Sequence, residues 1–142
     1  MLKGSCHCGA VAFEAPTPTE IAHCNCTYCD RVGALWAYCA PEDFTLTNDP
    51  ANLIEYAPNQ GAHFSCGTCG MVTHGRSPDW SDPDSEPEPG AEKISYNVRM
   101  DVDFDRSAVK VVDLDGRNQW RGCPGYWKEN GDAHRSRRHL DL

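Results

Sequence analysis

Three short cysteine clusters punctuate the chain: Cys6-His7-Cys8, Cys24-Asn25-Cys26-Thr27-Tyr28-Cys29 and Cys66-Gly67-Thr68-Cys69. Together they hold seven of the nine cysteines in 142 residues. A C-x-C or C-x-x-C pair places two sulfur atoms on one side of a tight turn, within reach of a single ion. Structural zinc is usually closed by four protein ligands, whereas catalytic zinc keeps three and an open position. Two pairs and one triad therefore predict one zinc site of each kind.

Zinc suits these ligands better than calcium or magnesium, which prefer oxygen. An iron–sulfur cluster on four cysteines is an alternative that no other marker in the sequence supports. A disulfide framework is disfavoured because the number of cysteines is odd and no secretion signal is present. Spacing alone leaves the pairing open, since Cys24 and Cys26 would join Cys66 and Cys69 as readily as Cys6 and Cys8 would.

Composition indicates one small domain with a thin core. Hydrophobic residues make up 39% of the chain, and 12 glycines and 10 prolines predict many turns. We expect a single domain over residues 1–142, whose folding is assisted by metal binding. No apolar run approaches the roughly 20 residues that cross a bilayer, and no apolar signal region is found at the N-terminus. These features predict a cytoplasmic protein with reduced thiols and no membrane partner.

The formal net charge of −8 disfavours binding to nucleic acid, so we expect no nucleic-acid partner. The main basic stretch, Arg135-Ser136-Arg137-Arg138, lies in a polar tail over residues 134–142 and is interpreted as a solvated end. Residues 78–92 are rich in proline, serine and acids, which predicts a mobile surface loop or lid.

Short apolar runs separated by proline, glycine, asparagine and aspartate predict an all-β fold. No stretch keeps a helical period for three turns, although a single helical turn is expected after Cys26. The expected strands cover residues 10–14, 20–24, 35–40, 44–47, 53–56, 62–66, 71–74, 93–100 and 108–114.

Three stretches resemble the glutathione-dependent formaldehyde-activating enzyme family, the GFA/CENP-V domain family: Gly4–Phe13, Cys24–Cys29 and Phe64–Gly70. Asn97-Val98-Arg99 also resembles the family's strand after the third cluster. The resemblance implies a β-tent fold of stacked short antiparallel sheets with zinc-binding turns. It further implies which cysteines act together. The structural zinc would be held by Cys6, Cys8, Cys66 and Cys69, and the catalytic zinc by Cys24, Cys26 and Cys29.

The activity for which this family is named joins formaldehyde to glutathione and gives S-(hydroxymethyl)glutathione. The resemblance therefore implies a zinc-dependent carbon–sulfur lyase with glutathione as co-substrate and a small aldehyde as its other substrate. Coordination to a metal favours the thiolate form of a thiol at neutral pH. Because three thiolates make zinc a weak Lewis acid, we favour delivery of the substrate thiolate over activation of the aldehyde carbonyl. The alternative is a non-catalytic zinc module that binds a protein or a small thiol.

Candidate contacts to glutathione lie near the clusters. Arg31, Arg76 and Arg99 could pair with its two carboxylates, because a planar guanidinium suits carboxylate recognition, although an ordinary salt bridge competes for each. We expect Trp36 near the pocket because it closely follows the middle cluster. Asp30 stands where the family often has arginine, and we expect this acid to make the site less favourable to an anionic thiol.

The remaining candidates are interpreted as structural. Cys39 is expected to be a core thiol and Cys123 an unpaired thiol near the C-terminus. A side chain next to a ligand in a strand points away from the ligand's face. The histidines interpreted as structural rather than metal-ligating are His7, His23, His63 and His74.

Overall fold

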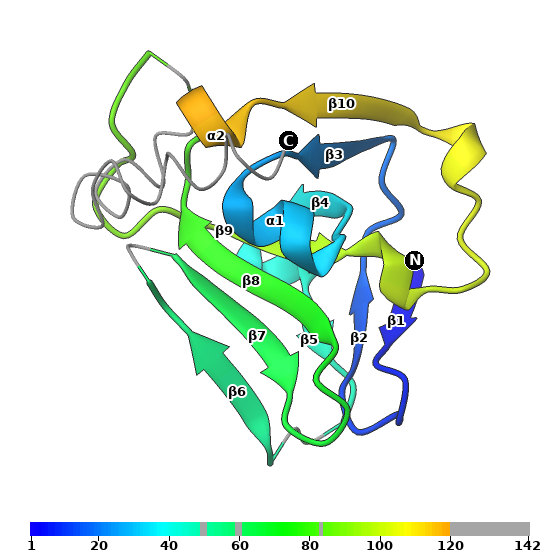
Figure 1. Cartoon of the computed structure of the whole chain (residues 1–142). Helices are drawn as coiled ribbons and strands as arrows, with labels where there is room; N and C mark the ends of the chain where they lie inside the picture. The colour runs from blue at the N-terminus through cyan, green and yellow to red at the C-terminus, as the bar shows by residue number, and fades with distance from the viewer. Residues whose placement is uncertain (49–50, 59–60, 83, 120–142) are drawn as a thin grey trace.

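The computed structural model describes residues 1–48, 51–58, 61–82 and 84–119. Their strands form two sheets, one of three strands in the order β1-β2-β5 and one of seven in the order β10-β3-β4-β9-β8-β7-β6 (Figure 1). The only α-helices in these residues are two short ones, and neither is long and apolar enough to cross a membrane. The prediction of an all-β fold is confirmed.

The three-stranded sheet contains β1 (Leu2–Ser5), β2 (Ala12–Ala15) and β5 (Thr45–Leu46). The seven-stranded sheet contains β3 (Glu20–Cys24), β4 (Trp36–Cys39), β6 (Leu53–Tyr56), β7 (Ala62–Cys66), β8 (Val72–Pro78), β9 (Glu92–Asn97) and β10 (Lys110–Leu114). The helices are α1 (Thr27–Val32) and α2 (Gly116–Gln119), with 3-10 turns at η1 (Pro41–Asp43), η2 (Val98–Met100) and η3 (Arg106–Ala108).

Three predicted strands, β3, β6 and β7, have the expected bounds. The sequence analysis missed β1, because Leu2-Lys3-Gly4-Ser5 contains only one apolar residue and a glycine. Pairing with β2 makes this segment a strand. The last predicted strand residues, 98–100, instead form η2, where the side chain of Asn97 accepts a hydrogen bond from the backbone N–H of Arg99.

One strand pair departs from the expected antiparallel arrangement. β10 pairs with β3 in parallel, in register from Lys110 opposite Glu20 to Leu114 opposite Cys24. The other ladders between the described strands are antiparallel. The long connection through η2 and η3 returns the chain to the start of β3, which makes parallel pairing possible. β10 thereby ends beside the middle cysteine cluster.

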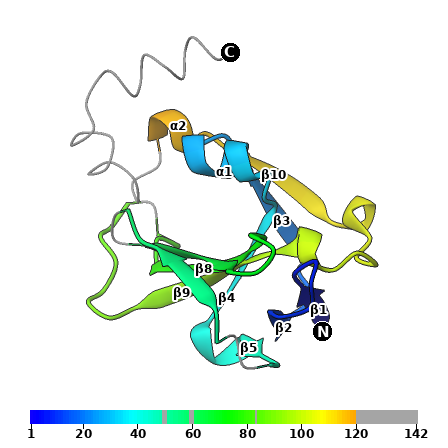
Figure 2. The same ribbon diagram turned by 60° about the horizontal axis from the view of Figure 1, so that its bottom comes forward.

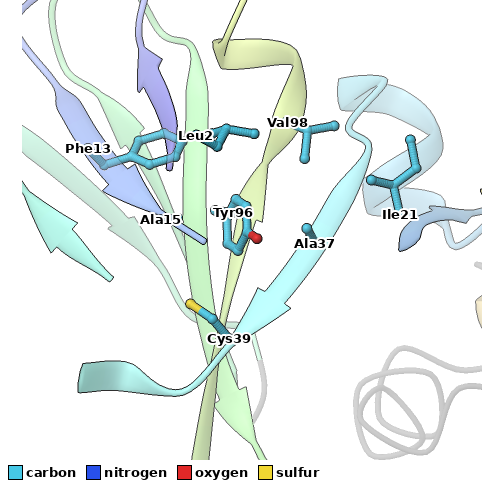
Figure 3. Close-up of a cluster of buried hydrophobic side chains, with 8 residues drawn as sticks. All are labelled: Leu2, Phe13, Ala15, Ile21, Ala37, Cys39, Tyr96 and Val98. Carbon is cyan, nitrogen blue, oxygen red and sulfur yellow. The ribbon is translucent and has the colours of Figure 1, made fainter. Parts of the chain in front are cut away.

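The main core lies between the two sheets. Figure 3 shows side chains from both sheets pointing toward one another, with Phe13 and Leu2 facing Tyr96. Cys39 belongs to this cluster and is 7% exposed, as expected for a core thiol. Because strand residues alternate between faces, Trp36 lies on the other face of the large sheet. Figure 2 shows α1 and α2 on that side and the three-stranded sheet opposite.

The acidic segment predicted as a loop connects two paired strands. β8 ends at Pro78 and β9 begins at Glu92, and these two residues face each other in the ladder. The backbone N–H of Asp79 also donates to the carbonyl of Ala91 at 2.9 Å. The loop is therefore closed at its base by backbone bonds. The predicted polar tail at 134–142 and Cys123 lie outside the described residues.

We predict that Gly4→Ala destabilises the fold. A Cβ at position 4 would overlap the ring of Phe13, which is only 1% exposed and packs against Phe44. Overpacking of this kind costs about 1–3 kcal/mol, measurable by urea unfolding. Ser5→Ala, at an exposed position of the same strand, serves as the control and should change stability by less than about 0.5 kcal/mol. Equal stability of the two variants would contradict the proposed overlap.

Candidate functional site: two sulfur clusters

Four sulfur atoms meet where the small sheet approaches the β7–β8 turn. Cys6, Cys8, Cys66 and Cys69 place their Sγ atoms within 4.8 Å of one another. The Cys8 sulfur lies 3.7 Å from that of Cys6 and 3.6 Å from that of Cys66. Cys6 and Cys66 are buried, whereas Cys8 is exposed. Four thiol ligands converging on one point fit a closed tetrahedral zinc site.

Backbone N–H groups point at these sulfur atoms. Val11 donates to the Cys6 sulfur at 3.2 Å and Thr68 to the Cys66 sulfur at 3.4 Å. Hydrogen bonds from the amide of Met71 and then of Cys8 lower the pKa of Cys69 to about 6. Because hydrogen bonds to a charged form favour that form, the turn stabilises the thiolates that a metal ion requires.

The glycines of the β7–β8 turn act in two different ways. Gly70 has a φ of 77°, which favours glycine. Gly67 is needed for close approach instead, since a Cβ there would meet the backbone carbonyl of Asn52, to which the Gly67 N–H donates at 2.9 Å. Gly70 therefore provides the left-handed backbone angle of the turn, whereas Gly67 provides the space for a close backbone contact.

The second cluster is local in sequence and fully buried. Cys24 ends β3, Cys26 is the N-cap of α1 and Cys29 lies within that helix. Their Sγ atoms lie within 4.8 Å of one another, and each residue is at most 5% exposed. Among the described residues, neither this group nor the four-cysteine group includes a histidine, aspartate or glutamate. An ion bound here would have three protein ligands from these residues.

Donors surround the sulfur atoms of this cluster. The backbone N–H of Cys29 donates to the Cys26 sulfur at 3.3 Å, and that of Cys26 donates to the Cys24 sulfur at 3.4 Å. Hydrogen bonds from the thiols of Cys24 and Cys29 lower the pKa of Cys26 to about 2. Its hydrogen bond to Cys26 in turn raises the pKa of Cys24 to about 12. Hydrogen bonds with the other two thiols likewise raise the pKa of Cys29. The cluster without a metal therefore favours one thiolate, on Cys26, and a thiophilic cation would displace the protons of the other two thiols.

Trp36 is a hydrogen-bond donor to the cluster. Its indole Nε1 lies 3.1 Å from the Cys29 sulfur, and the residue is 2% exposed. Trp36, which we expected near the substrate pocket, contacts the cluster itself, and its contact with a substrate stays a prediction. The contact identifies a role that the sequence did not suggest, since an N–H donor reduces the charge on a thiolate ligand.

A ring stack borders the same cluster. The centroid of the Tyr28 ring, in α1, lies 3.8 Å from the ring centroid of His63 on β7 and 5.9 Å from that of Tyr56 on β6. Burial lowers the pKa of His63 to about 4. His63 is therefore a neutral histidine beside the cluster. His74 instead lies on the core side, between Phe64 and Phe44.

The other predicted contact residues occupy different positions. Arg31 is exposed on α1 and donates to the carbonyl of Thr27 at 3.3 Å. Arg99 is exposed in η2. Arg76 pairs with Glu55 at 3.1 Å and Glu92 at 3.4 Å, as in an ordinary salt bridge. His23 is exposed and pairs with Asp113 at 3.0 Å.

Two residues that no motif in the sequence marks hold the middle cluster. Asn25 lies between two of the cysteines, and its backbone N–H donates to the carbonyl of Leu114 at 3.1 Å. Arg117, in α2, donates to the carbonyl of Asn25 at 2.9 Å and approaches the carboxylate of Asp30 at 3.3 Å. Asp30 is therefore paired with a cation, and its expected effect on an anionic thiol stays a prediction. No local pattern predicts these contacts, because they join segments about 90 residues apart.

Comparisons with known proteins agree with this geometry. The sequence model of "glutathione-dependent formaldehyde-activating enzyme" matches residues 1–84, which include all seven clustered cysteines. The chain belongs to this family. A crystal structure of a Rhodobacter sphaeroides protein is also similar, with a TM-score of 0.59 and 28% sequence identity over 78% of this chain and 99% of that chain. Membership supports a glutathione-dependent, formaldehyde-activating function, while β9, β10 and α2 follow the matched region.

We predict that the two clusters respond differently to loss of one ligand. Cys66→Ser should prevent stable folding, because binding of the structural ion is part of the folding free energy. Cys26→Ser should leave a folded chain with one zinc ion instead of two. Metal analysis of the purified variants, together with circular dichroism, tests this. Two ions retained by Cys26→Ser would contradict the assignment of the middle cluster.

We also predict that Trp36→Phe weakens metal binding at the middle cluster, because it removes the N–H donor to the Cys29 sulfur. Loss of a hydrogen bond to a metal ligand typically costs about 10- to 100-fold in affinity. Competition with a chromophoric chelator measures this. Tyr96→Phe is the control, since it loses a buried hydrogen bond to Pro16 in the core. Equal metal affinities in Trp36→Phe and the control would contradict the role of the indole.

Proposed function

We propose that the chain is a zinc-dependent carbon–sulfur lyase of the S-(hydroxymethyl)glutathione synthase type. Its substrates would be a thiol, glutathione, and a small aldehyde such as formaldehyde. The observation that carries the proposal is the incomplete set of ligands at Cys24, Cys26 and Cys29, beside a second cluster that has four. Three ligands leave a position where a substrate can reach an ion. A reducing compartment would keep both the cluster and the substrate thiol reduced, so the proposed location is cytoplasmic.

In this proposal the three cysteines hold zinc, and zinc when bound would stabilise the substrate thiol as its thiolate. The chain's own contribution is to fix and moderate the sulfur ligands. The N-terminus of α1 directs the N–H of Cys29 at the Cys26 sulfur, and Trp36 donates to the Cys29 sulfur. These donors offset the charge of three thiolates, so a further anionic sulfur is less strongly repelled.

The reaction joins the two substrates without a change in oxidation state. The thiolate sulfur forms a bond to the aldehyde carbon, and the π electrons of the carbonyl pass to its oxygen. That oxygen takes a proton from water, which balances the proton released when the substrate thiol ionised. The product is a hemithioacetal. The chain needs only to bind and orient the substrates and to keep the sulfur ionised.

The contacts to the rest of glutathione are part of the proposal. Arg31 and Arg99 are exposed and therefore available to the carboxylates of a bound tripeptide. Arg31 has the stronger support because it shares α1 with Cys26 and Cys29. Trp36 is buried, and its indole N–H donates to the Cys29 sulfur. We therefore propose that only the edge of its ring contacts the substrate.

Burial of the three cysteines favours a second candidate, a zinc module without catalysis. Each cysteine is at most 5% exposed, which limits access to an ion held there. Such a module would bind its zinc inertly. Exchange of the metal and its response to an added thiol distinguish the two candidates.

We predict that the zinc-loaded chain accelerates hemithioacetal formation from glutathione and formaldehyde above the spontaneous rate. Proton NMR exchange spectroscopy of the equilibrium mixture measures the rate of interconversion of substrates and product. Comparison of this rate with and without the chain separates the catalysed from the spontaneous reaction. Cys26→Ser is the inactive control, because it removes a ligand from the open site only. The proposal is wrong if the chain does not raise the rate above the spontaneous one for any thiol and aldehyde tried and does not bind glutathione. That outcome would favour the inert module.

A further inference from the structure

We infer that Arg117 is a positioning residue for the three-cysteine site, holding the peptide between Cys24 and Cys26 against the helix that carries Cys29. Arg117 lies after the region that the family model matches, whereas its partners Asn25 and Asp30 lie within it. The inference rests on the proposed function only for its kinetic test. Its metal-binding test stands independently of any reaction.

The guanidinium of Arg117 is buried and makes directed contacts. Its side chain is 8% exposed. Its Nε donates to the backbone carbonyl of Asn25 at 2.9 Å, and its Nη2 lies 3.3 Å from Oδ2 of Asp30. The backbone N–H of Arg117 also donates to Oδ1 of Asn25 at 3.0 Å. A charged group is rarely buried unless its hydrogen bonds are satisfied, so these contacts define where the side chain lies.

These contacts bear on the ligands from both sides. Asn25 is the residue between Cys24 and Cys26, and Asp30 directly follows Cys29. One side chain therefore links the loop that carries two ligands to the helix that carries the third. Figure 1 shows why this is possible, since α2 lies beside α1 at the end of β10.

Further bonds from the same segment restrict Asn25. Its backbone N–H donates to the carbonyl of Leu114 at 3.1 Å, and its side-chain Nδ2 donates to Oδ1 of Asp115 at 3.0 Å. The peptide between the two cysteines is thus bonded through its N–H, its carbonyl and its side chain to residues 114–117. Rotation of this peptide would move the Cys24 and Cys26 sulfur atoms, and it would break several of these bonds.

The contact to the carbonyl is more important than the ion pair. The Asp30 side chain is 55% exposed, so solvent screens its attraction to Arg117. The hydrogen bond from the guanidinium to the Asn25 carbonyl is charge-assisted and part-buried, and the Arg117 side chain that makes it is only 8% exposed. Loss of Asp30 should therefore disturb the site less than loss of Arg117. The ion pair adds a second effect, because it compensates the carboxylate that directly follows Cys29.

The test compares four variants of the full chain loaded with zinc: Arg117→Gln, Arg117→Lys, Asp30→Asn and Lys110→Gln. Lys110 is the control, because it pairs with Glu20 at 3.1 Å between β10 and β3, the strands that precede Arg117 and Asn25, at the end away from the cysteines. Transfer of zinc to a chromophoric chelator measures release from each site. Cobalt substitution gives a spectrum that reports ligand geometry.

We expect Arg117→Gln to bind one of its two metal ions about 10- to 100-fold more weakly, as is typical when a residue that orients a metal ligand is lost. Release of the other ion should match the unsubstituted chain, and the cobalt spectrum should change. Arg117→Lys should show a smaller effect of the same kind, because an ammonium donates to the carbonyl without the planar fork. The metal affinities of Asp30→Asn should be close to those of the unsubstituted chain, and the metal affinities of Lys110→Gln should equal them.

Unchanged release and an unchanged cobalt spectrum in both Arg117 variants would overturn the inference. Equal weakening of both metal sites would also overturn it, because that pattern indicates general loss of stability. Should Arg117→Gln fail to fold, Arg117→Lys provides the same comparison. In the lyase assay, the kcat of each Arg117 variant should fall. The fall should be larger for the variant that binds the affected metal ion more weakly. A selective metal effect with no lyase activity in any form would retain the positioning role and reject the proposed function.

Discussion

Close approach of four thiol sulfur atoms is the constraint on which the fold depends. Cys8 and Cys66 are 58 residues apart in sequence, and their sulfur atoms lie 3.6 Å apart. Four thiolates at such distances repel one another strongly unless a cation lies between them. A metal ion bound by these four cysteines would link the β1–β2 connection to the β7–β8 turn. In a chain with only 39% hydrophobic residues, this link would supplement a small core between the two sheets.

The three-cysteine cluster is built on a different principle. Its ligands come from the end of β3 and the first turn of α1, so they are close together in sequence. Its support comes from other elements, since Trp36 donates from β4 and the segment after β10 holds Asn25. A site that lacks a fourth protein ligand depends more on such outer contacts, because fewer bonds to the ion fix its ligands. This difference between a self-contained cluster and a supported one is consistent with the structural and catalytic roles proposed for them.

The two faces of the large sheet carry different side chains, one facing the core and the other facing the three-cysteine cluster. Alternation along β4 sends Ala37 and Cys39 into the core and Trp36 toward the cysteine cluster. The same alternation separates His63, which stacks on Tyr28 beside the cluster, from His74, which packs with Phe44 on the core side. Position in the sheet therefore distinguishes histidines that the sequence analysis treated alike.

Cysteine spacing and the turn residues around it determined much of this protein. They gave the all-β class, the two sets of candidate ligands and the bounds of three strands, because these features depend on residues that are neighbours in sequence. The short strand at Leu2–Ser5, the parallel pairing of β10 and the contacts of Trp36 and Arg117 were decided only by the tertiary structure. The pairing of β10 and the contacts of Arg117 need partners about 90 residues away along the chain. β1 and Trp36 have nearer partners, β2 and Cys29, but no local pattern indicates that these groups meet. A hydrogen bond between distant segments leaves no periodic trace in sequence, whereas a metal ligand pair does, because a tight turn fixes the separation of its two sulfur atoms.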